Sequence, residues 1–172
     1  MAEDLVKQSV LDRLTGADLV VTGGGDQGRP ARTWEESVRV LEKNVLRDLE
    51  RLLNTRQVAD PASSPHDHLE RSVFNYGLLD FSNMSADSSR TPDEIRRLIK
   101  EAIELFEPRL TDVEVVDPMA GQETKKGQRR RRTVRFRVEA TLRTDPDPER
   151  VEFDTVLDVT AKRFEVSSEP HA

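Results

Sequence analysis

The chain has no cysteine, so disulfide bonds and thiolate chemistry are excluded. Aromatic residues make up only 5% of its 172 residues, and hydrophobic residues make up 35%, the same share as charged residues. This polar balance predicts a small core, with the remaining segments disordered or bound to a partner. The length suits one domain, and the lack of cysteine fits a cytoplasmic protein.

Long apolar runs are also missing. No stretch of about 18 apolar residues occurs, so no transmembrane helix and no direct membrane insertion are expected. The N-terminus, Met1-Ala2-Glu3-Asp4, is acidic and no apolar stretch follows it, which argues against a signal peptide.

What the sequence has in excess is acidic charge, broken by one basic segment. The formal net charge is −6, but residues 125–132 hold six basic residues and no acid. The rest of the chain has 21 basic and 33 acidic residues, a net charge of −12. The basic segment continues to Arg135 and Arg137, has no interleaved aromatics and falls between two predicted strands. It therefore indicates an exposed hairpin loop that contacts acidic partner surfaces, and nucleic acid is not the expected ligand.

Residues 1–32 are predicted to form a flexible N-terminal segment. Leu5 to Leu14 is amphipathic but too short to be a stable helix alone. Thr15 to Arg32 is rich in glycine and indicates a linker. A phosphate-binding loop is the alternative for residues 22–28, but no Gly-Lys-Ser/Thr follows them.

Two amphipathic helices are predicted. The first begins at a capping box, with Thr33 as N-cap and Glu36 three residues on, and continues to Leu53 at helical spacing. The second begins at Thr91-Pro92 and ends at Glu107-Pro108. A short helix over 66–74 is expected between them, within loops.

The C-terminal part predicts strands over 110–116, 133–142 and 151–159, and a short fourth strand over 162–166. Arginines on the second strand face acidic residues on the third, and such pairs help to set the register: Arg135 and Arg137 against Glu152, Asp154 and Asp158. The order of elements predicts an α+β domain over 33–166, with two main helices plus a short helix packed on one face of a small, mainly antiparallel β-sheet. Residues 167–172 are expected to be a disordered tail.

The segment Phe106-Glu107-Pro108-Arg109-Leu110 joins the second long helix to the first strand. Pro108 ends the helix and biases Glu107 toward an extended backbone, so two opposite charges are held at a rigid corner. Two interpretations stay open. Glu107, Pro108 and Arg109 dock a partner, or Glu107 and Arg109 form an internal salt bridge that closes the corner.

Four segments together point to a known family. They are Ser9–Leu14 (Ser9-Val10-Leu11-Asp12-Arg13-Leu14), Leu46–Arg56, Ser72–Asp80 and Phe106–Leu110. In this order and spacing the chain resembles TssE, the baseplate subunits of bacterial type VI secretion systems. These subunits belong to a wider family of contractile-tail baseplate wedge proteins from phages. The resemblance covers roughly residues 5–14 and 34–160.

The resemblance implies a structural role without enzymatic activity or cofactor. Members of the family lie in the baseplate wedge with TssF, TssG and TssK, and template the first ring of the TssB/TssC sheath. The complex assembles in the cytoplasm on the apparatus docked at the inner membrane. The family's Glu-Pro-Arg motif falls on Glu107, Pro108 and Arg109 and is implicated in holding wedge partners. An adaptor of the same fold that binds a regulator is the alternative.

Two catalytic or ligand-binding alternatives are weaker. His66 and His68 are potential metal ligands, but they lie in a proline- and serine-rich loop without a third strong ligand, so no metal site is predicted. A cell-wall hydrolase needs a protonated carboxyl as general acid, whereas Arg109 favours the ionised form of Glu107. No catalytic residue is therefore predicted.

Overall fold

The computed structural model of the chain describes residues 5–17, 19–20, 29–31, 33–57, 71–79, 91–118 and 133–168. The helical elements are α1 (Val10–Thr15), α2 (Trp34–Asn54), the 3-10 turn η1 (Val73–Asn75) and α4 (Thr91–Phe106). The strands are β1 (Leu19–Val20), β2 (Arg29–Pro30), β3 (Leu110–Val116), β4 (Thr133–Leu142), β5 (Glu149–Asp158) and β6 (Arg163–Ser167). The predicted α+β fold is confirmed.

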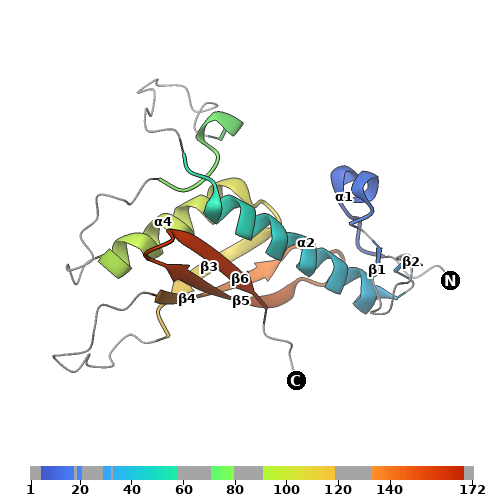
Figure 1. Cartoon of the computed structure of the whole chain (residues 1–172). Helices are drawn as coiled ribbons and strands as arrows, with labels where there is room; N and C mark the ends of the chain where they lie inside the picture. Colours follow the sequence, from blue (N-terminus) through green and yellow to red (C-terminus); the bar gives the residue numbers. More distant parts are fainter. Residues whose placement is uncertain are drawn as a thin grey trace.

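Within the described residues, the main sheet has the order β3-β4-β5-β6, and every neighbouring pair is antiparallel. Figure 1 shows α2 and α4 lying across one face of this sheet. Because side chains alternate along a strand, the covered face is apolar and the other face is polar. Arg137 lies opposite Asp154 in the register, with its Nε 3.0 Å from the Asp154 carboxylate, which confirms this predicted cross-strand pair.

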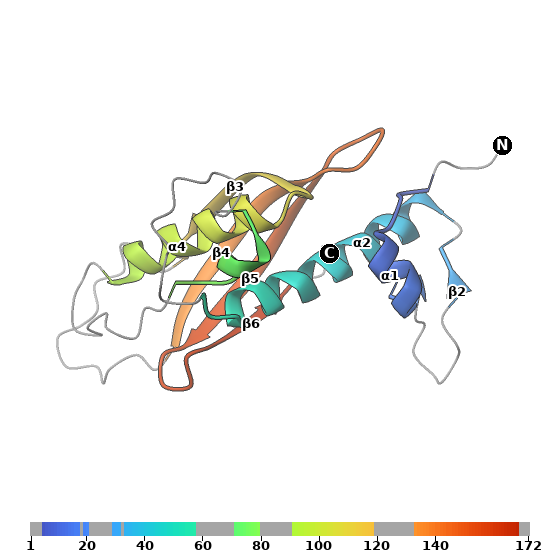
Figure 2. The same ribbon diagram turned by 90° about the horizontal axis from the view of Figure 1, so that it is seen from above.

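Helix α2 begins where its capping residue predicts. The Thr33 hydroxyl accepts a hydrogen bond from the Glu36 N–H at 3.2 Å, which satisfies one of the unpaired donors at the start of α2. The buried side of α2 carries an apolar stripe that faces the sheet: Leu41, Val45, Leu49, Leu52 and Leu53. Seen from above, α2 and α4 lie side by side over the strands (Figure 2).

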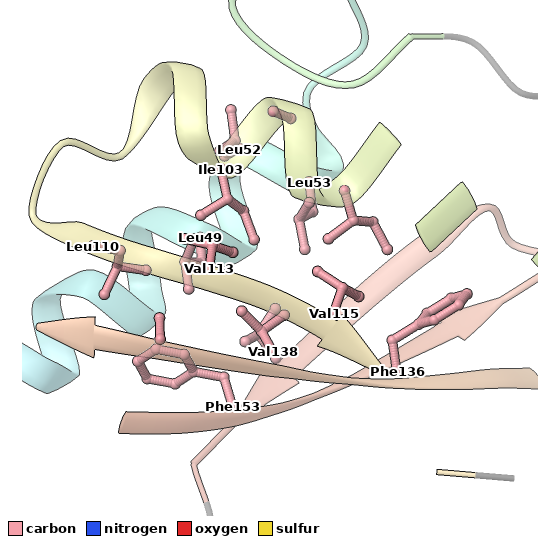
Figure 3. Packing of buried hydrophobic residues seen from close by; sticks show 14 of the residues in the cluster. Leu49, Leu52, Leu53, Ile103, Leu110, Val113, Val115, Phe136, Val138 and Phe153 are labelled. Atoms are coloured by element: carbon pink, nitrogen blue, oxygen red, sulfur yellow. The ribbon is translucent and has the colours of Figure 1, made fainter. Parts of the chain in front are cut away.

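A layer of large apolar side chains fills the space between helices and sheet. Leu49 and Ile103 from the helices meet Val138 and Phe153 from the strands, as Figure 3 shows, and all four are at most 1% exposed. Burying an aliphatic or aromatic side chain of this size contributes about 1.5–3 kcal/mol. This layer is therefore the main source of stability in the fold.

A bulge in β3 adjusts the direction of its side chains. Leu110 and Val113 are three residues apart, so a regular strand would point them to opposite faces. The register with β4 shifts between Thr111 and Glu114, and Asp112 takes a left-handed backbone with φ 52°. Aspartate tolerates this conformation better than most residues. The extra residue lets Leu110 and Val113 both face the core.

The segment 71–79 is attached to the end of α2. Its described part contains the 3-10 turn Val73–Asn75 where the sequence predicts the end of an α-helix over 66–74, and residues 66–70 lie outside the described residues. The Leu78 N–H donates to the Thr55 carbonyl at 2.8 Å. Gly77 has φ 118°, and a Cβ there would lie 2.5 Å from that same carbonyl oxygen, so only glycine permits this close approach.

The N-terminal segment predicted to be a flexible peptide packs on α2 where it is described. The Val6 N–H donates to the Ser37 hydroxyl at 3.2 Å, and the Gln8 amide donates to the Ser37 carbonyl at 3.0 Å. Both views show α1 beside α2 at one end of the molecule (Figures 1 and 2). None of the helices in the described part of the chain is long and apolar enough to cross a membrane.

Candidate functional site

The backbone of the helix-to-strand corner is held on both sides of Pro108. The Glu107 N–H donates to the Ile103 carbonyl at 2.9 Å and so continues the bonding of α4. The Leu110 N–H then donates to the Glu107 carbonyl at 3.1 Å, which closes a tight turn around the proline. The Arg143 N–H donates to the Arg109 carbonyl at 2.8 Å and ties the corner to the end of β4.

Glu107 and Arg109 pair with each other across this turn. The Arg109 Nε lies 2.7 Å from Glu107 Oε1, and its Nη2 lies 2.6 Å from Oε2, so the contact is bidentate. The Arg109 N–H also donates to Oε1 at 3.2 Å. Glu107 is only 5% exposed, whereas a quarter of the Arg109 side chain is accessible. Such paired, charge-assisted bonds fix orientation as well as contributing energy.

The pair continues into α2 and α1. Arg109 Nη2 lies 2.7 Å from Asp48 Oδ2, and the other oxygen of Asp48 accepts from Arg47 Nε at 3.0 Å. Arg47 Nη2 then reaches Asp12 Oδ1 in α1 at 2.8 Å. Arg109 Nη1 lies 3.9 Å from the second oxygen of Asp12. We call these five residues the charge network: Asp12, Arg47, Asp48, Glu107 and Arg109.

Asp12 is the most deeply buried member of the charge network, at 1% exposure. Its carboxylate also accepts a 2.7 Å hydrogen bond from the Ser9 hydroxyl, while that hydroxyl accepts from the Asp12 N–H as the N-cap of α1. Each carboxylate of the network therefore has at least one guanidinium within 3 Å. Buried charges are tolerated only when they are paired and hydrogen-bonded in this way.

The titration of these groups reflects the pairing. Burial raises the pKa of Asp12, but hydrogen bonds from Arg47 and Ser9 outweigh it and hold this pKa below its ordinary value. The bond to Asp12 raises the pKa of Arg47. Burial lowers the pKa of Arg109, yet its bonds to Glu107 and Asp48 raise it overall. All three groups are thus charged at neutral pH.

The paired charges of this arrangement are suited to holding chain segments together and not to transferring a proton. Both oxygens of Glu107 accept from Arg109, so neither is set up to give a proton to a substrate. Among the residues that the structure describes, no group of three or more histidine or acidic side chains is placed to hold a metal ion. The charge network holds three segments of the chain together: α1, α2 and the corner.

A family model for baseplate wedge protein gp25 matches residues 39–147 of this chain. The chain belongs to this family. The matched range includes most of α2, the corner and β4, and so four of the five members of the charge network. A comparison with curated proteins found no match.

The sequence-based site of this baseplate wedge protein and the observed site overlap in part. The structure brings Glu107 and Arg109 together as an internal salt bridge, one of the two interpretations left open. Pro108 is exposed at the turn. Partner docking by the three residues stays a prediction.

Asp12, Arg47 and Asp48 were not predicted as site residues, although all three lie in the segments that carry the family resemblance. The sequence does carry a signal for Asp12: it follows the N-cap Ser9 by three residues and lies on the side of the short helix opposite its apolar residues.

Other candidates lie elsewhere. Tyr76 caps the C-terminal end of η1, and its ring packs edge-on against that of Phe106, with the ring centroids 5.4 Å apart. Several candidates lie outside the described residues: His66, His68, the glycines over 23–28 and the basic run over 125–132.

Proposed function

We propose that this baseplate wedge protein is a structural subunit of a bacterial type VI secretion system. It links the wedge partners TssF, TssG and TssK and templates the first ring of the TssB/TssC sheath. The family match supports a baseplate role. The ordered motifs that resemble TssE support the secretion system, and the charge network supports a holding role.

Sheath templating rests on one observation, the outer edge of β6. The side chain of Asn54 pairs with both main-chain groups of Phe164: its amide donates to the carbonyl at 2.8 Å, and its oxygen accepts from the N–H at 2.9 Å. Phe164 therefore points its main chain away from β5. Because main-chain groups alternate in direction along an antiparallel strand, Val166 also points its N–H and C=O outward. This edge is where a neighbouring strand can pair.

The opposite edge of the sheet is less suited to an added strand. β3 contains the bulge at Asp112, and bulges at edges disrupt regular pairing. Of the two edges, β6 thus gives a sheath subunit the more regular template.

The test is sheath assembly in cells with a fluorescent TssB-type subunit. Val166→Pro removes the outward N–H, and Val166→Ala is the matched control, since it trims the same side chain and keeps the N–H. We expect sheaths to be lost with proline and retained with alanine. Sheaths at normal frequency with Val166→Pro would contradict templating by β6.

Wedge docking at the corner is proposed for Pro108 and for the accessible part of Arg109. Glu107 is covered, so it acts by orienting Arg109. Among the described residues, Arg109 Nη1 has only the 3.9 Å contact to Asp12, which leaves its N–H groups for a partner carboxylate or helix end. Arg109→Lys keeps a positive charge but removes these donors. We expect it to lower the affinity for TssF and TssG about tenfold, measured by titration of purified subunits.

A structural role also predicts no turnover of cell wall. Purified protein incubated with peptidoglycan should release no soluble fragments. Release that depends on Glu107 would instead support a hydrolase.

A further inference from the structure

Helix α1 presents its apolar side chains to solvent. Val10 is 73% exposed, Leu11 63% and Leu14 79%, the largest such exposures in the described chain apart from Val73. With about 100° of rotation per residue, the three occupy one face roughly 100° wide. Asp12 lies ~150° from the centre of that face and is buried. Helix α1 is therefore amphipathic, but its apolar face is exposed and its charged residue Asp12 is buried against the protein.

This orientation is imposed by polar contacts on the opposite side. Arg47 holds Asp12 at 2.8 Å, and the Asn44 amide donates to the Gln8 side chain at 3.4 Å. Together with the two bonds that Val6 and Gln8 make to Ser37, these contacts attach α1 and the residues before it to three positions along α2. An unsupported helix of six residues would not keep its shape in water. The charge network therefore keeps the apolar face folded and turned outward.

We propose that this apolar face, formed by Val10, Leu11 and Leu14, docks an amphipathic helix of a wedge partner whose apolar stripe is bordered by acidic side chains. The proposal rests on the wedge role above and names the surface through which that role is carried out. It also gives the charge network a purpose beyond stability, since the network presents the docking surface.

The charge around the face identifies the occupant. Lys7 precedes α1 and Arg13 lies within it; both are exposed, and neither has a carboxylate partner among the described residues. A second copy of the chain would bring these cations against their own equivalents, which disfavours self-association. The backbone of α1 is internally bonded, so it offers no edge to a strand. A ridge of side chains at i, i+1 and i+4 fits the groove of another helix.

The test measures binding of the full chain to purified TssF and TssG by titration. Leu11→Glu/Leu14→Glu alters two exposed side chains and should leave the unfolding midpoint unchanged. We expect binding to fall at least 100-fold, since two apolar contacts are lost and two like charges are added to an acidic partner. Arg13→Glu should weaken binding about tenfold. Val73→Glu, which changes an exposed valine outside α1, is the matched control and should bind as the native chain does.

The possible outcomes separate the two proposals. Native-like binding by Leu11→Glu/Leu14→Glu would overturn the docking face and leave the wedge role intact. No binding by the native chain would overturn both. Two further measurements test other occupants: sedimentation of the native chain for self-association, and flotation with phosphatidylglycerol vesicles for lipid binding. If the double substitution changes either of these and leaves TssF and TssG binding unaltered, the proposed occupant is wrong.

Discussion

Between the helices and the sheet, the buried side chains are apolar and the exposed ones are charged. At the junction of α1, α2 and the corner the pattern is reversed: Asp12 and Glu107 are buried, while Leu11 and Leu14 face solvent. The two regions share α2, which sends Leu49 into the core and Arg47 into the charge network. One helix therefore joins two kinds of packing.

The difference teaches what each kind of packing supplies. Apolar burial is strong and non-directional, so it gives stability. Paired charges contribute little net energy, because desolvation offsets their attraction, but they are directional. The core keeps the domain folded, and the charge network determines where α1 lies. Four predictions test this division, from the largest expected effect to the smallest.

Phe153→Ala should lower the free energy of unfolding by about 4 kcal/mol, because it leaves a cavity at a side chain that is 0% exposed. Urea unfolding followed by circular dichroism measures the change. Phe74→Ala is the control and should stay within about 0.5 kcal/mol, since Phe74 is 48% exposed. If Phe153→Ala lowers the free energy of unfolding by less than about 1 kcal/mol, the apolar core is not the main source of stability.

Arg109→Met should cost about 3 kcal/mol, because it leaves the buried Glu107 carboxylate without its cation. Adding Glu107→Gln removes that stranded charge and should recover roughly 1–2 kcal/mol, which a double-mutant cycle measures. Arg97→Met on the exposed side of α4 should change little. Additive losses in the cycle would show that the two side chains are not coupled.

Acid should release α1 before the core unfolds. The pKa of Asp12 is below its ordinary value of 3.8, so its contribution is complete above that value and is lost as the pH falls through the lowered pKa. Hydrogen exchange should show α1 amides losing protection in this window while β4 amides keep theirs. Asp12→Asn should lower α1 protection about tenfold at neutral pH and abolish the pH dependence. If the amides of α1 and β4 lose protection at the same pH, the stability of α1 is not separate from that of the core.

Thr155→Val should raise the free energy of unfolding by about 0.5–1 kcal/mol. Thr155 is 0% exposed and its hydroxyl has no hydrogen-bond partner among the described residues. A methyl group of similar size removes that unsatisfied polar atom. Thermal unfolding measures the shift, and Thr141→Val, at a half-buried position on β4, serves as control. If Thr155→Val instead destabilises the protein, the buried hydroxyl of Thr155 contributes to stability, and apolar packing does not account for this position.

Local patterns were sufficient to predict most of the fold. Alternation over 133–142 predicts β4 with its observed ends, and the capping residue Thr33 places the start of α2. The bulge was not predicted, because the positive φ of Asp112 depends on pairing with β4. The charge network was predicted only at Glu107 and Arg109, which are two residues apart. Its other contacts include pairs 35 and 61 positions apart, and periodicity carries no information about such pairs.

The side chain of Asn54 has a further consequence for assembly. It bonds both main-chain groups of Phe164, so a strand added to β6 as proposed above would pair only with the residues beyond Phe164. In that arrangement the end of α2 would limit how far the added strand extends along β6.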